Sequence, residues 1–385
     1  MLRSFTITRV RGIEIRIHPS FLLVLLWVAF HWGVMDDRGV SALIYGAILV
    51  FFIFCCVVLH ELGHSFMAIH YGVKVHDITL LPIGGVARLE HLPARPASEA
   101  LIALAGPLTN VAIAVALVPP LLLLGVLKGY DSLVDYLAYV DDIALGGLLI
   151  YLFFTNIMLF LFNLLPAFPM DGGRVVRAGL SAVVGRERAT RFAVLLGQAA
   201  AVALAIFGIW WGDYLLPLIS LFIIAAAYAE GRAVRLESAM RRLRVGQFAL
   251  WDMGGISAHH PLTYALRGGP RDVVVTDGSH VIGMLWRHQL LPGLNGGTAS
   301  RTVADVMDRD IVSVDIDASV YDVQQKMHEL DRWAMPVTED GQYRGIFTAD
   351  RFVHVYRYLN TQAGGSRLAT SWAVAISNAF RGLVR

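Results

Sequence analysis

The sequence predicts an α-helical polytopic membrane protein followed by a soluble α/β region, and two observations carry this prediction. Of the 385 residues, 56% are hydrophobic and 16% are charged, whereas about a quarter of the residues are charged in an ordinary soluble domain. Long apolar runs fill the first 230 residues, and acidic and basic residues crowd the region after Glu230. This asymmetry predicts a membrane-embedded domain over residues 1–230 with a soluble part behind it.

The composition also limits the classes of molecule that the protein is expected to bind. The formal net charge is +2 and no lysine-rich arm is present, so no nucleic-acid partner is expected. The two cysteines, Cys55 and Cys56, are adjacent in an apolar run and are expected to pack as small hydrophobic residues. The basic, alternating N-terminal stretch does not have the pattern of a cleavable signal peptide.

Six stretches are apolar enough to be predicted as membrane spans, for which about 20 residues are needed. In chain order they are Phe21–Val34, Ala42–Leu59, Ala100–Leu127, Ile143–Leu165, Phe192–Trp211 and Tyr214–Ala229. The first and the last are short, so they are expected to be tilted, extended by flanking residues or partly re-entrant.

The positive charges predict the orientation of the spans, because short cytoplasmic loops retain Lys and Arg. These residues gather before the first span, between the second and third, between the fourth and fifth, and after the sixth. The alternate loops carry mainly aspartates. Both the N- and the C-terminus are therefore expected in the cytoplasm, and the chain is expected to be integral to the cell's inner or plasma membrane.

Two segments outside the spans alternate apolar and polar residues with period two, as half-buried strands do. They are Gly12–His18 and Val73–Glu90, the second broken by a turn at Pro82–Gly85. Non-helical backbone beside a bilayer persists where protein or water satisfies its hydrogen bonds. We therefore expect a small β-sheet on the cytoplasmic side of the helices.

The stretch HELGH, His60 to His64, ends the second span. The spacing of four residues places His60 and His64 on one face of a helix, where both can reach one Zn²⁺, and Glu61 beside them can take a proton from a water on the metal. Ionisable residues inside a span need a partner, which weakens the alternative that these are merely satisfied polar groups of a helical bundle. A catalytic zinc site usually takes three protein ligands, so a third is expected elsewhere.

Asp171, in the stretch NLLPAFPMDGGR, is the predicted third ligand. The second span reaches His60 after 18 residues from Ala42, about 27 Å of helix, and the fourth span also runs inward and reaches Asp171 soon after Leu165. Both sets of groups therefore approach the same depth near the cytoplasmic face. The flanking prolines and glycines permit the chain to turn Asp171 back toward the bundle. Asn163, just before this break, either donates a hydrogen bond to a developing oxyanion or bound strand, or packs between helices.

These motifs together resemble the site-2 proteases, intramembrane zinc metalloproteases, in the form that carries paired CBS modules. HELGH, AGPLTN at Ala105–Asn110 and NLLPAFPMDG at Asn163–Gly172 are similar to the three signatures of that family, in the same order. The resemblance implies one Zn²⁺ per chain, held by the three residues His60, His64 and Asp171, with Glu61 as the general base. It also implies that Asn110 and Asn163 support the site near the scissile peptide.

The resemblance further implies the substrate: a membrane-spanning helix that is cut within or near the bilayer, as in regulated intramembrane proteolysis. Candidates are a membrane-anchored transcription regulator or an anti-sigma factor. A helical peptide bond is shielded by its own hydrogen bonds, so the substrate must unwind before water attacks it. An extended segment could then add as a strand to the edge of the Val73–Glu90 hairpin, where Gly84 and Gly85 either favour this approach or merely form the turn.

The soluble part also resembles a known module. Residues Thr302–Phe352 look like a CBS module, and Phe248–Leu290 look like a weaker copy, which predicts a tandem CBS domain over residues 247–360, after a basic linker at 231–246. Such pairs often bind adenine nucleotides, but Arg351 stands where an aspartate is expected. A structural role, or a homodimer through the CBS domains, is the alternative. An amphipathic tail is expected over residues 361–385.

Two rival functions remain open. A metal-dependent transporter or channel gated by the CBS pair would also place His and Asp inside the membrane. A catalytically inactive membrane scaffold would use the CBS pair alone. Glu61 discriminates, because only a hydrolase needs it as a base.

Overall fold

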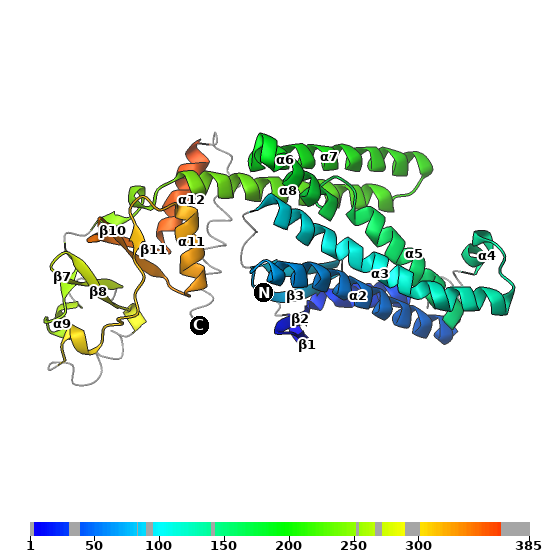
Figure 1. Ribbon diagram of the computed structural model, residues 1–385, viewed down its shortest axis with the longest axis horizontal. Coiled ribbons are helices and arrows are strands. Elements are labelled where there is room, and N and C mark those ends of the chain that lie inside the picture. Colours follow the sequence, from blue (N-terminus) through cyan, green and yellow to red (C-terminus); the bar gives the residue numbers. More distant parts are fainter. Residues whose placement is uncertain are drawn as a thin grey trace. The chain divides into compact units, whose positions relative to one another are not determined.

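The chain folds into two units, which a computed structural model describes over residues 4–30, 39–82, 84–89, 95–139, 143–251, 254–265, 272–288 and 301–362. The first unit is Met1–Val234 and the second is Arg235–Arg385. The first holds the long helices and a small sheet, and the second is a mixed α/β unit (Figure 1).

Five helices of the first unit are long and apolar enough to cross a membrane. They are α2 (Gly39–His70), α3 (Pro96–Lys128), α5 (Leu145–Asn163), α7 (Arg186–Trp211) and α8 (Leu215–Arg242). The first of the six expected spans, Phe21–Val34, is not confirmed. Its described part is a 3-10 turn, Pro19–Phe21, followed by the nine residues of α1, Leu22–Phe30, about 14 Å of helix against a hydrocarbon core of about 30 Å.

Helix α3 is the centre of the first unit and packs against α2, α5 and α6 (Asp171–Val184). An apolar cluster from α2 and α5, including Leu49, Cys56 and Leu152, is closed by Ile113 and Leu117 of α3. Nearer the HELGH stretch, α2 and α3 approach so closely that a Cβ on Gly63 would lie 2.3 Å from Thr109 Oγ1. The motifs HELGH and AGPLTN therefore meet where the two helices are in close contact.

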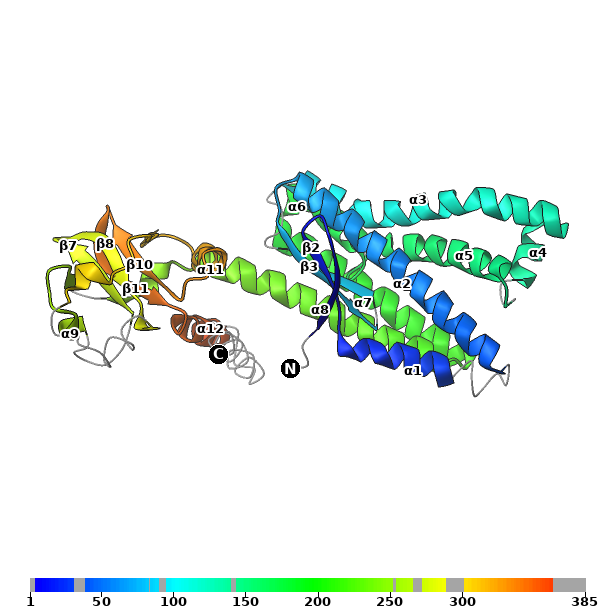
Figure 2. The same cartoon turned by 90° about the horizontal axis from the view of Figure 1, so that it is seen from below.

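The predicted β-sheet is present and has four strands in the order β1–β2–β3–β4. Strands β2 (Ile13–Ile17), β3 (Val75–Leu81) and β4 (Gly84–Leu89) occupy the two segments expected from the alternation, and β1 (Phe5–Val10) adds an edge strand that was not expected. Strands β2 and β3 are parallel, so α1 and α2, which connect them, lead away from the sheet and return (Figure 2). Strand β4 lies beside α2 and forms the other edge.

Two elements of the first unit depart from expectation. Asp171 begins the helix α6, an element that was not predicted and that precedes α7. The last span is longer than its apolar stretch, because α8 continues to Arg242 and includes much of the segment 231–246 that was predicted as a linker. A short helix, α4 (Leu133–Ala138), begins with a capping box between Ser132 and Asp135.

The second unit contains the same strand arrangement twice. In one sheet β9 (Val314–Asp315) is parallel to β10 (Ala334–Glu339), which pairs antiparallel with β11 (Gln342–Thr348). In the other, β6 (Ile256–Ser257) is parallel to β7 (Val273–Asp277), which pairs antiparallel with β8 (His280–Leu285). This repeat coincides with the two CBS-like segments of the sequence.

Helices complete the second unit. They are α9 (Leu262–Ala265) in the first repeat and α11 (Val320–Glu329) and α12 (Arg351–Gln362) in the second, where β5 (Leu250–Trp251) joins β11. The expected amphipathic tail, 361–385, lies outside the described residues from 363 onward.

Candidate metal centre

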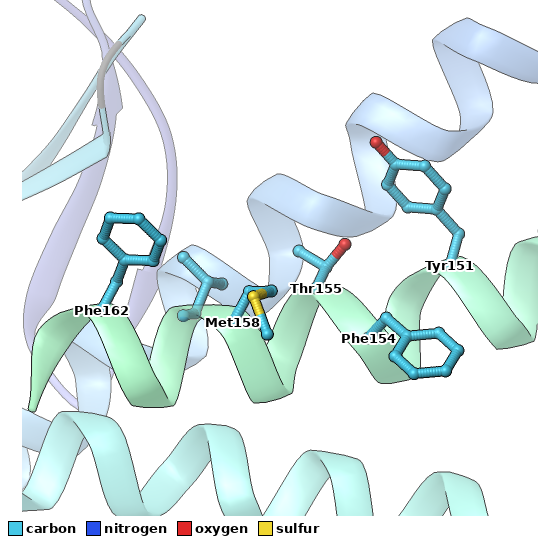
Figure 3. A pocket seen from close by; sticks show the side chains of 6 residues that line it. Tyr151, Phe154, Thr155, Met158 and Phe162 are labelled. Atoms are coloured by element: carbon cyan, nitrogen blue, oxygen red, sulfur yellow. The ribbon is translucent and has the colours of Figure 1, made fainter. Parts of the chain in front are cut away.

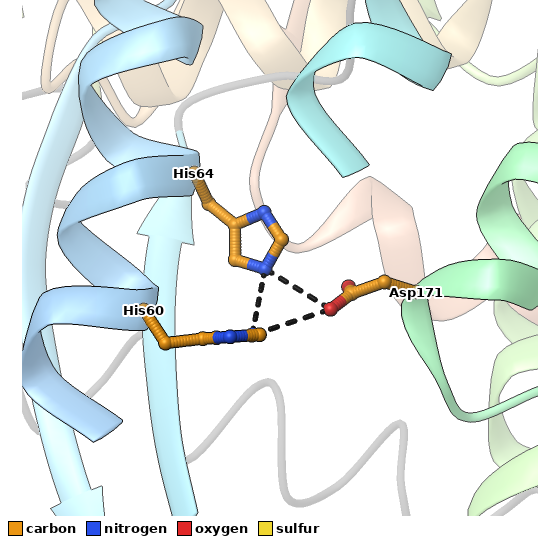
Figure 4. Close-up of side chains that lie close together, drawn as sticks. All are labelled: His60, His64 and Asp171. Carbon is orange, nitrogen blue, oxygen red and sulfur yellow. Dashed lines mark hydrogen bonds and ion pairs between the residues drawn. The ribbon is translucent and has the colours of Figure 1, made fainter. Parts of the chain in front are cut away.

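Three side chains from separate parts of the first unit converge on one point. His60 and His64 lie one turn apart on α2, and Asp171 is the first residue of α6 (Figure 4). All three residues are buried, with 6 to 8% of their surface exposed. Among the described residues, this is the cluster of His, Cys, Asp or Glu whose ligand atoms lie close enough to hold a metal ion.

The distances within the cluster are compatible with a bound zinc ion. His64 Nε2 lies 3.1 Å from His60 Nε2 and 3.1 Å from Asp171 Oδ2, and His60 Nε2 lies 3.3 Å from the same oxygen. Ligands at about 2.0 to 2.1 Å from a tetrahedral zinc ion are about 3.3 Å apart. The three atoms therefore match one face of a zinc tetrahedron, which leaves a fourth position for a water or a substrate oxygen.

The second nitrogen of each imidazole is held by α3. The Nδ1–H of His64 donates to the Ile102 carbonyl oxygen over 2.7 Å, which leaves the lone pair of Nε2 directed into the cluster. The amide of Asn110 lies 3.1 Å from His60 Nδ1, and the Oδ1 of this fully buried amide has no hydrogen-bond partner among the described residues. If the side-chain amide is rotated by 180°, so that its oxygen and nitrogen exchange places, Oδ1 accepts a hydrogen bond from His60 Nδ1–H. The lone pair of His60 Nε2 is then also available to bind a metal.

Asp171 reaches the histidines because two glycines follow it. A Cβ on Gly172 would lie 2.2 Å from the Leu165 carbonyl oxygen, and one on Gly173 would lie 2.6 Å from the backbone nitrogen of Phe168. The first turn of α6 can therefore pack directly on the loop after α5. Burial raises the pKa of Asp171, but its close contacts with His60 and His64 outweigh this effect and lower the pKa well below its usual range. The carboxylate is thus ionised, as a metal ligand must be.

Glycines also bring two further elements against the cluster. A Cβ on Gly106 of α3 would lie 2.2 Å from His64 Nε2, and a Cβ on Gly85 of β4 would lie 2.5 Å from Glu61 Cγ. Glu61 of α2 therefore packs directly against β4, the edge strand of the sheet. The sequence offered AGPLTN and Gly85 as motif residues, but these close approaches depend on tertiary packing and carry no local signal.

The two predicted asparagines have different surroundings. Asn110 belongs to the centre through His60, as described above. Asn163 is the last residue of α5 and is half-buried; it takes part in none of the hydrogen bonds that join the described residues of the cluster. The carbonyl of Ile102, which orients His64, was not anticipated, because any residue supplies a backbone carbonyl.

Comparison with known proteins places this centre in a family. A family model described as peptidase family M50 matches residues 48–144 and 123–207, and a CBS domain model matches residues 303–358. A zinc metalloprotease of Methanocaldococcus jannaschii is 32% identical over 352 residues, which cover 90% of this chain and 94% of that protein. The chain belongs to the site-2 protease family, peptidase family M50. Zinc dependence and metalloprotease activity of the site-2 protease type follow from this membership.

Two further relatives of this site-2 protease cover less of it. Stage IV sporulation protein FB of Bacillus subtilis is 26% identical over 165 residues, 43% of this chain and 46% of that protein. Among solved structures, a site-2 protease from Methanocaldococcus jannaschii is 36% identical, with a TM-score of 0.45, and the match covers 60% of this chain and 95% of that one.

Proposed function

We propose that this protein hydrolyses peptide bonds in or near the transmembrane segment of membrane-anchored proteins, using one Zn²⁺ held by His60, His64 and Asp171. The observation that carries the proposal is the triangle of three ligand atoms, 3.1 to 3.3 Å apart, on two helices of an apolar bundle. Regulated intramembrane proteolysis of an anchored transcription regulator or anti-sigma factor is the corresponding biological role.

The residues around the centre have separate tasks in this reaction. When bound, a zinc ion supplies a water of lowered pKa and polarises the scissile carbonyl. The Glu61 carboxylate accepts a proton from the attacking water and returns it to the leaving amide nitrogen. Asn110 acts through His60, whose ring it holds. Asn163, at the end of α5, is proposed to contact the substrate backbone.

The edge of β4 supports the idea that the substrate binds in extended form. Within the described sheet β4 pairs with β3 on one side only, and Gly85 of this strand packs directly against Glu61. A substrate strand added to β4 would have its backbone fixed by ladder hydrogen bonds beside the general base. Addition of a strand would therefore stabilise the unwound form of a helical substrate.

A substitution of Gly85 tests the placement of Glu61. In Gly85→Ala the new Cβ would lie 2.5 Å from Glu61 Cγ, so the carboxylate must shift. We expect kcat on a model single-span substrate to fall about 10-fold or more, since misplacement of about 1 Å can cost 100-fold, with zinc content unchanged. Val86→Ala, at the next and exposed position of β4, is the matched control and should cleave like the wild type. Equal activity of both variants would contradict the assigned position of Glu61.

An apolar groove along α5 offers a surface for the membrane-embedded part of the substrate. It encloses about 330 Å³ and is lined by one stripe of the helix: Tyr151, Phe154, Thr155, Met158, Leu159 and Phe162. These side chains follow one another along the helix at intervals of one to three residues (Figure 3). The stripe ends next to Asn163, just before the loop that leads to Asp171, so a helix lying along it would direct its end toward the centre.

The orientation is proposed from the charge bias together with the sheet. The arginine-rich loops and the N-terminal strands fall on the side where α2 ends with the metal centre. Both termini are therefore proposed to lie in the cytoplasm, and cleavage is proposed to occur near the cytoplasmic face of the membrane.

The second unit is proposed to be a tandem CBS domain over about residues 247–360, with a structural or dimerising role. A cavity of about 30 Å³ lies between its two repeats, against several hundred Å³ for ordinary small-molecule sites. Asp308 accepts hydrogen bonds from Trp286 Nε1 over 2.8 Å and from Arg332 Nη1 over 2.7 Å, and these bonds lower the pKa of Asp308. This network occupies the space beside the cavity, which disfavours an adenine nucleotide there.

Metal removal tests the function directly. Full-length protein in lipid vesicles is expected to cleave a single-span reporter, to lose at least about 100-fold of this activity when zinc is chelated, and to recover it with one equivalent of Zn²⁺ per chain. Mass spectrometry of the products would give the cleaved bond. The rival transporter predicts instead that zinc crosses the vesicle membrane while the reporter stays intact.

A further inference from the structure

A second buried cluster of charged residues lies in the first unit, and the reaction makes no direct use of it. Arg177 of α6 is completely buried, at 0% exposure. Its Nε donates to Glu99 Oε1 of α3 over 2.7 Å, with Nη2 at 2.6 Å from the same oxygen, and its Nη1 donates to Glu230 Oε1 of α8 over 2.8 Å. One guanidinium therefore connects three helices.

The cluster is joined to the metal centre through α6 and its preceding loop. Asp171 begins α6, and Arg177 follows six residues later on the same helix, about 9 Å along its axis. The guanidinium of Arg177 also lies over the ring of Phe168, 4.9 Å from its centroid. Gly173 of α6 packs on the backbone of Phe168. Arg177, itself on α6, therefore contacts the loop on which the first turn of α6 and Asp171 rest.

Helix α3 connects this charged cluster to the other two proposed ligands, His60 and His64. Glu99, which binds Arg177, lies one turn before Ile102, whose carbonyl oxygen accepts the hydrogen bond from His64. Asn110, farther along α3, holds His60. The same helix thus sets the positions of the histidines directly, and that of Asp171 through the ion pair between Glu99 and Arg177.

The remaining partner, Glu230, stands where the first unit leads into the second. Helix α8 continues past Val234, the last residue of the first unit. Beyond that point Met240 is buried in the hydrophobic core of the second unit, with Leu236 packed against it. A displacement of α8 would move Glu230, because the helix is continuous from this residue into that core.

We propose that Arg177 is a positioning residue for Asp171, and that through Glu230 it makes the position of this ligand depend on α8. The inference rests on the proposed assignment of Asp171 as a metal ligand. It also supplies a route by which the second unit can act on the metal centre: tension or rotation of α8 alters the bond between Glu230 and Arg177, and α6 transmits the change to the ligand.

Cobalt binding tests the proposal without using proteolysis as the readout. The full-length protein is loaded with Co²⁺, and two quantities are measured: the absorption bands of the tetrahedral site, and the rate of Co²⁺ loss to excess chelator. Substitutions of residues that support metal ligands typically weaken binding 10- to 100-fold. We expect Glu230→Ala to speed Co²⁺ loss by about this factor and to alter the bands. Glu230→Gln should have a smaller effect, because its amide oxygen can still accept from Arg177 Nη1.

Controls separate positioning from general stability. Arg191→Gln removes an exposed pair on α7, in which Arg191 lies 3.9 Å from Glu187, and should behave like the wild type. Arg177→Lys keeps the charge but cannot span Glu99 and Glu230 together, and its effect should not add to that of Glu230→Gln. If Arg177→Lys does not fold, the Glu230 variants still decide, because the Glu230 side chain is 30% exposed and tolerates replacement.

The outcomes are distinguishable. Variants that melt at lower temperature but release Co²⁺ at the wild-type rate, with unchanged bands, would show that the cluster only holds the helices together, and would overturn the inference alone. Failure of the wild type to take up Co²⁺ would overturn the proposed metal site as well.

Discussion

Glu61→Gln is expected to abolish cleavage of a single-span reporter while the protein keeps its zinc. The side chain stands between the two histidines in sequence but is not one of the three converging residues that are the proposed ligands, His60, His64 and Asp171. Glutamine has nearly the same volume, so the contact with Gly85 remains, but an amide cannot accept a proton from water. General base catalysis contributes about 10² to 10⁴ in rate, and a loss in this range is expected in kcat rather than in KM.

The measurement needs a metal assay beside the cleavage assay. Zinc content per chain in the purified Glu61→Gln protein should equal that of the wild type, because no ligand is altered. Ser65→Ala is a suitable control: Ser65 is buried on the same helix and donates only to the Glu61 carbonyl oxygen of the backbone, so cleavage should persist. Full proteolytic activity in Glu61→Gln would exclude the base role and favour the rival transporter.

The convergence of the metal centre was predictable from the sequence because it depends on topology. His60 lies near the end of the second apolar stretch and Asp171 follows the fourth. Both stretches are predicted to run inward, so the depths of the two residues are estimated by counting residues, and the i, i+4 spacing aligns the two histidines. The strands β2, β3 and β4 were predictable because a half-buried strand alternates with period two. Strand β1 was not predicted although its residues alternate, because its apolar residues Phe5 and Ile7 are exposed and do not mark a buried face.

The supporting contacts were not predictable, for a physical reason. Arg177 pairs with residues 78 positions before it and 53 positions after it, and no local period relates such positions. In the sequence Arg177 was one of several basic residues of a loop, assigned to the cytoplasmic side by its charge. Only the packing of α3, α6 and α8 shows that it is buried. The same holds for Gly106, whose missing side chain matters because His64 of another helix lies against it.

The span count illustrates a limit of hydropathy. Hydropathy measures whether a segment is apolar, and the segment after Phe21 is apolar, but the described helix there is too short to cross a membrane. Conversely, α8 extends well beyond its apolar part, because charged residues after Glu230 continue the helix. Composition therefore locates apolar runs better than it locates helix ends, which depend on caps and on tertiary contacts.

Asp171→Asn is expected to have the largest effect on metal binding while leaving the fold intact. Asparagine preserves the shape of the side chain and one oxygen, so the close packing of Gly172 and Gly173 on the loop after α5 is undisturbed. The charge is lost, however, and two neutral imidazoles with an amide oxygen bind Zn²⁺ far more weakly than two imidazoles with a carboxylate. Since loss of a mere supporting residue costs 10- to 100-fold in affinity, loss of this ligand's charge should cost at least about 100-fold, and cleavage should fall in parallel.

Competition with a chelator of known zinc affinity measures this change, and high zinc should partly restore activity to Asp171→Asn but not to Glu61→Gln. That contrast distinguishes a metal ligand from a general base more clearly than the loss of activity in either variant. A raised zinc concentration compensates for weakened zinc binding but not for a missing base. Asp213→Asn, at an exposed residue between α7 and α8, is the control for removing one negative charge and should bind zinc like the wild type. Unaltered zinc affinity in Asp171→Asn would mean that the third ligand is another group, and that the contact of Asp171 with the two imidazoles serves only to hold α6 against α2.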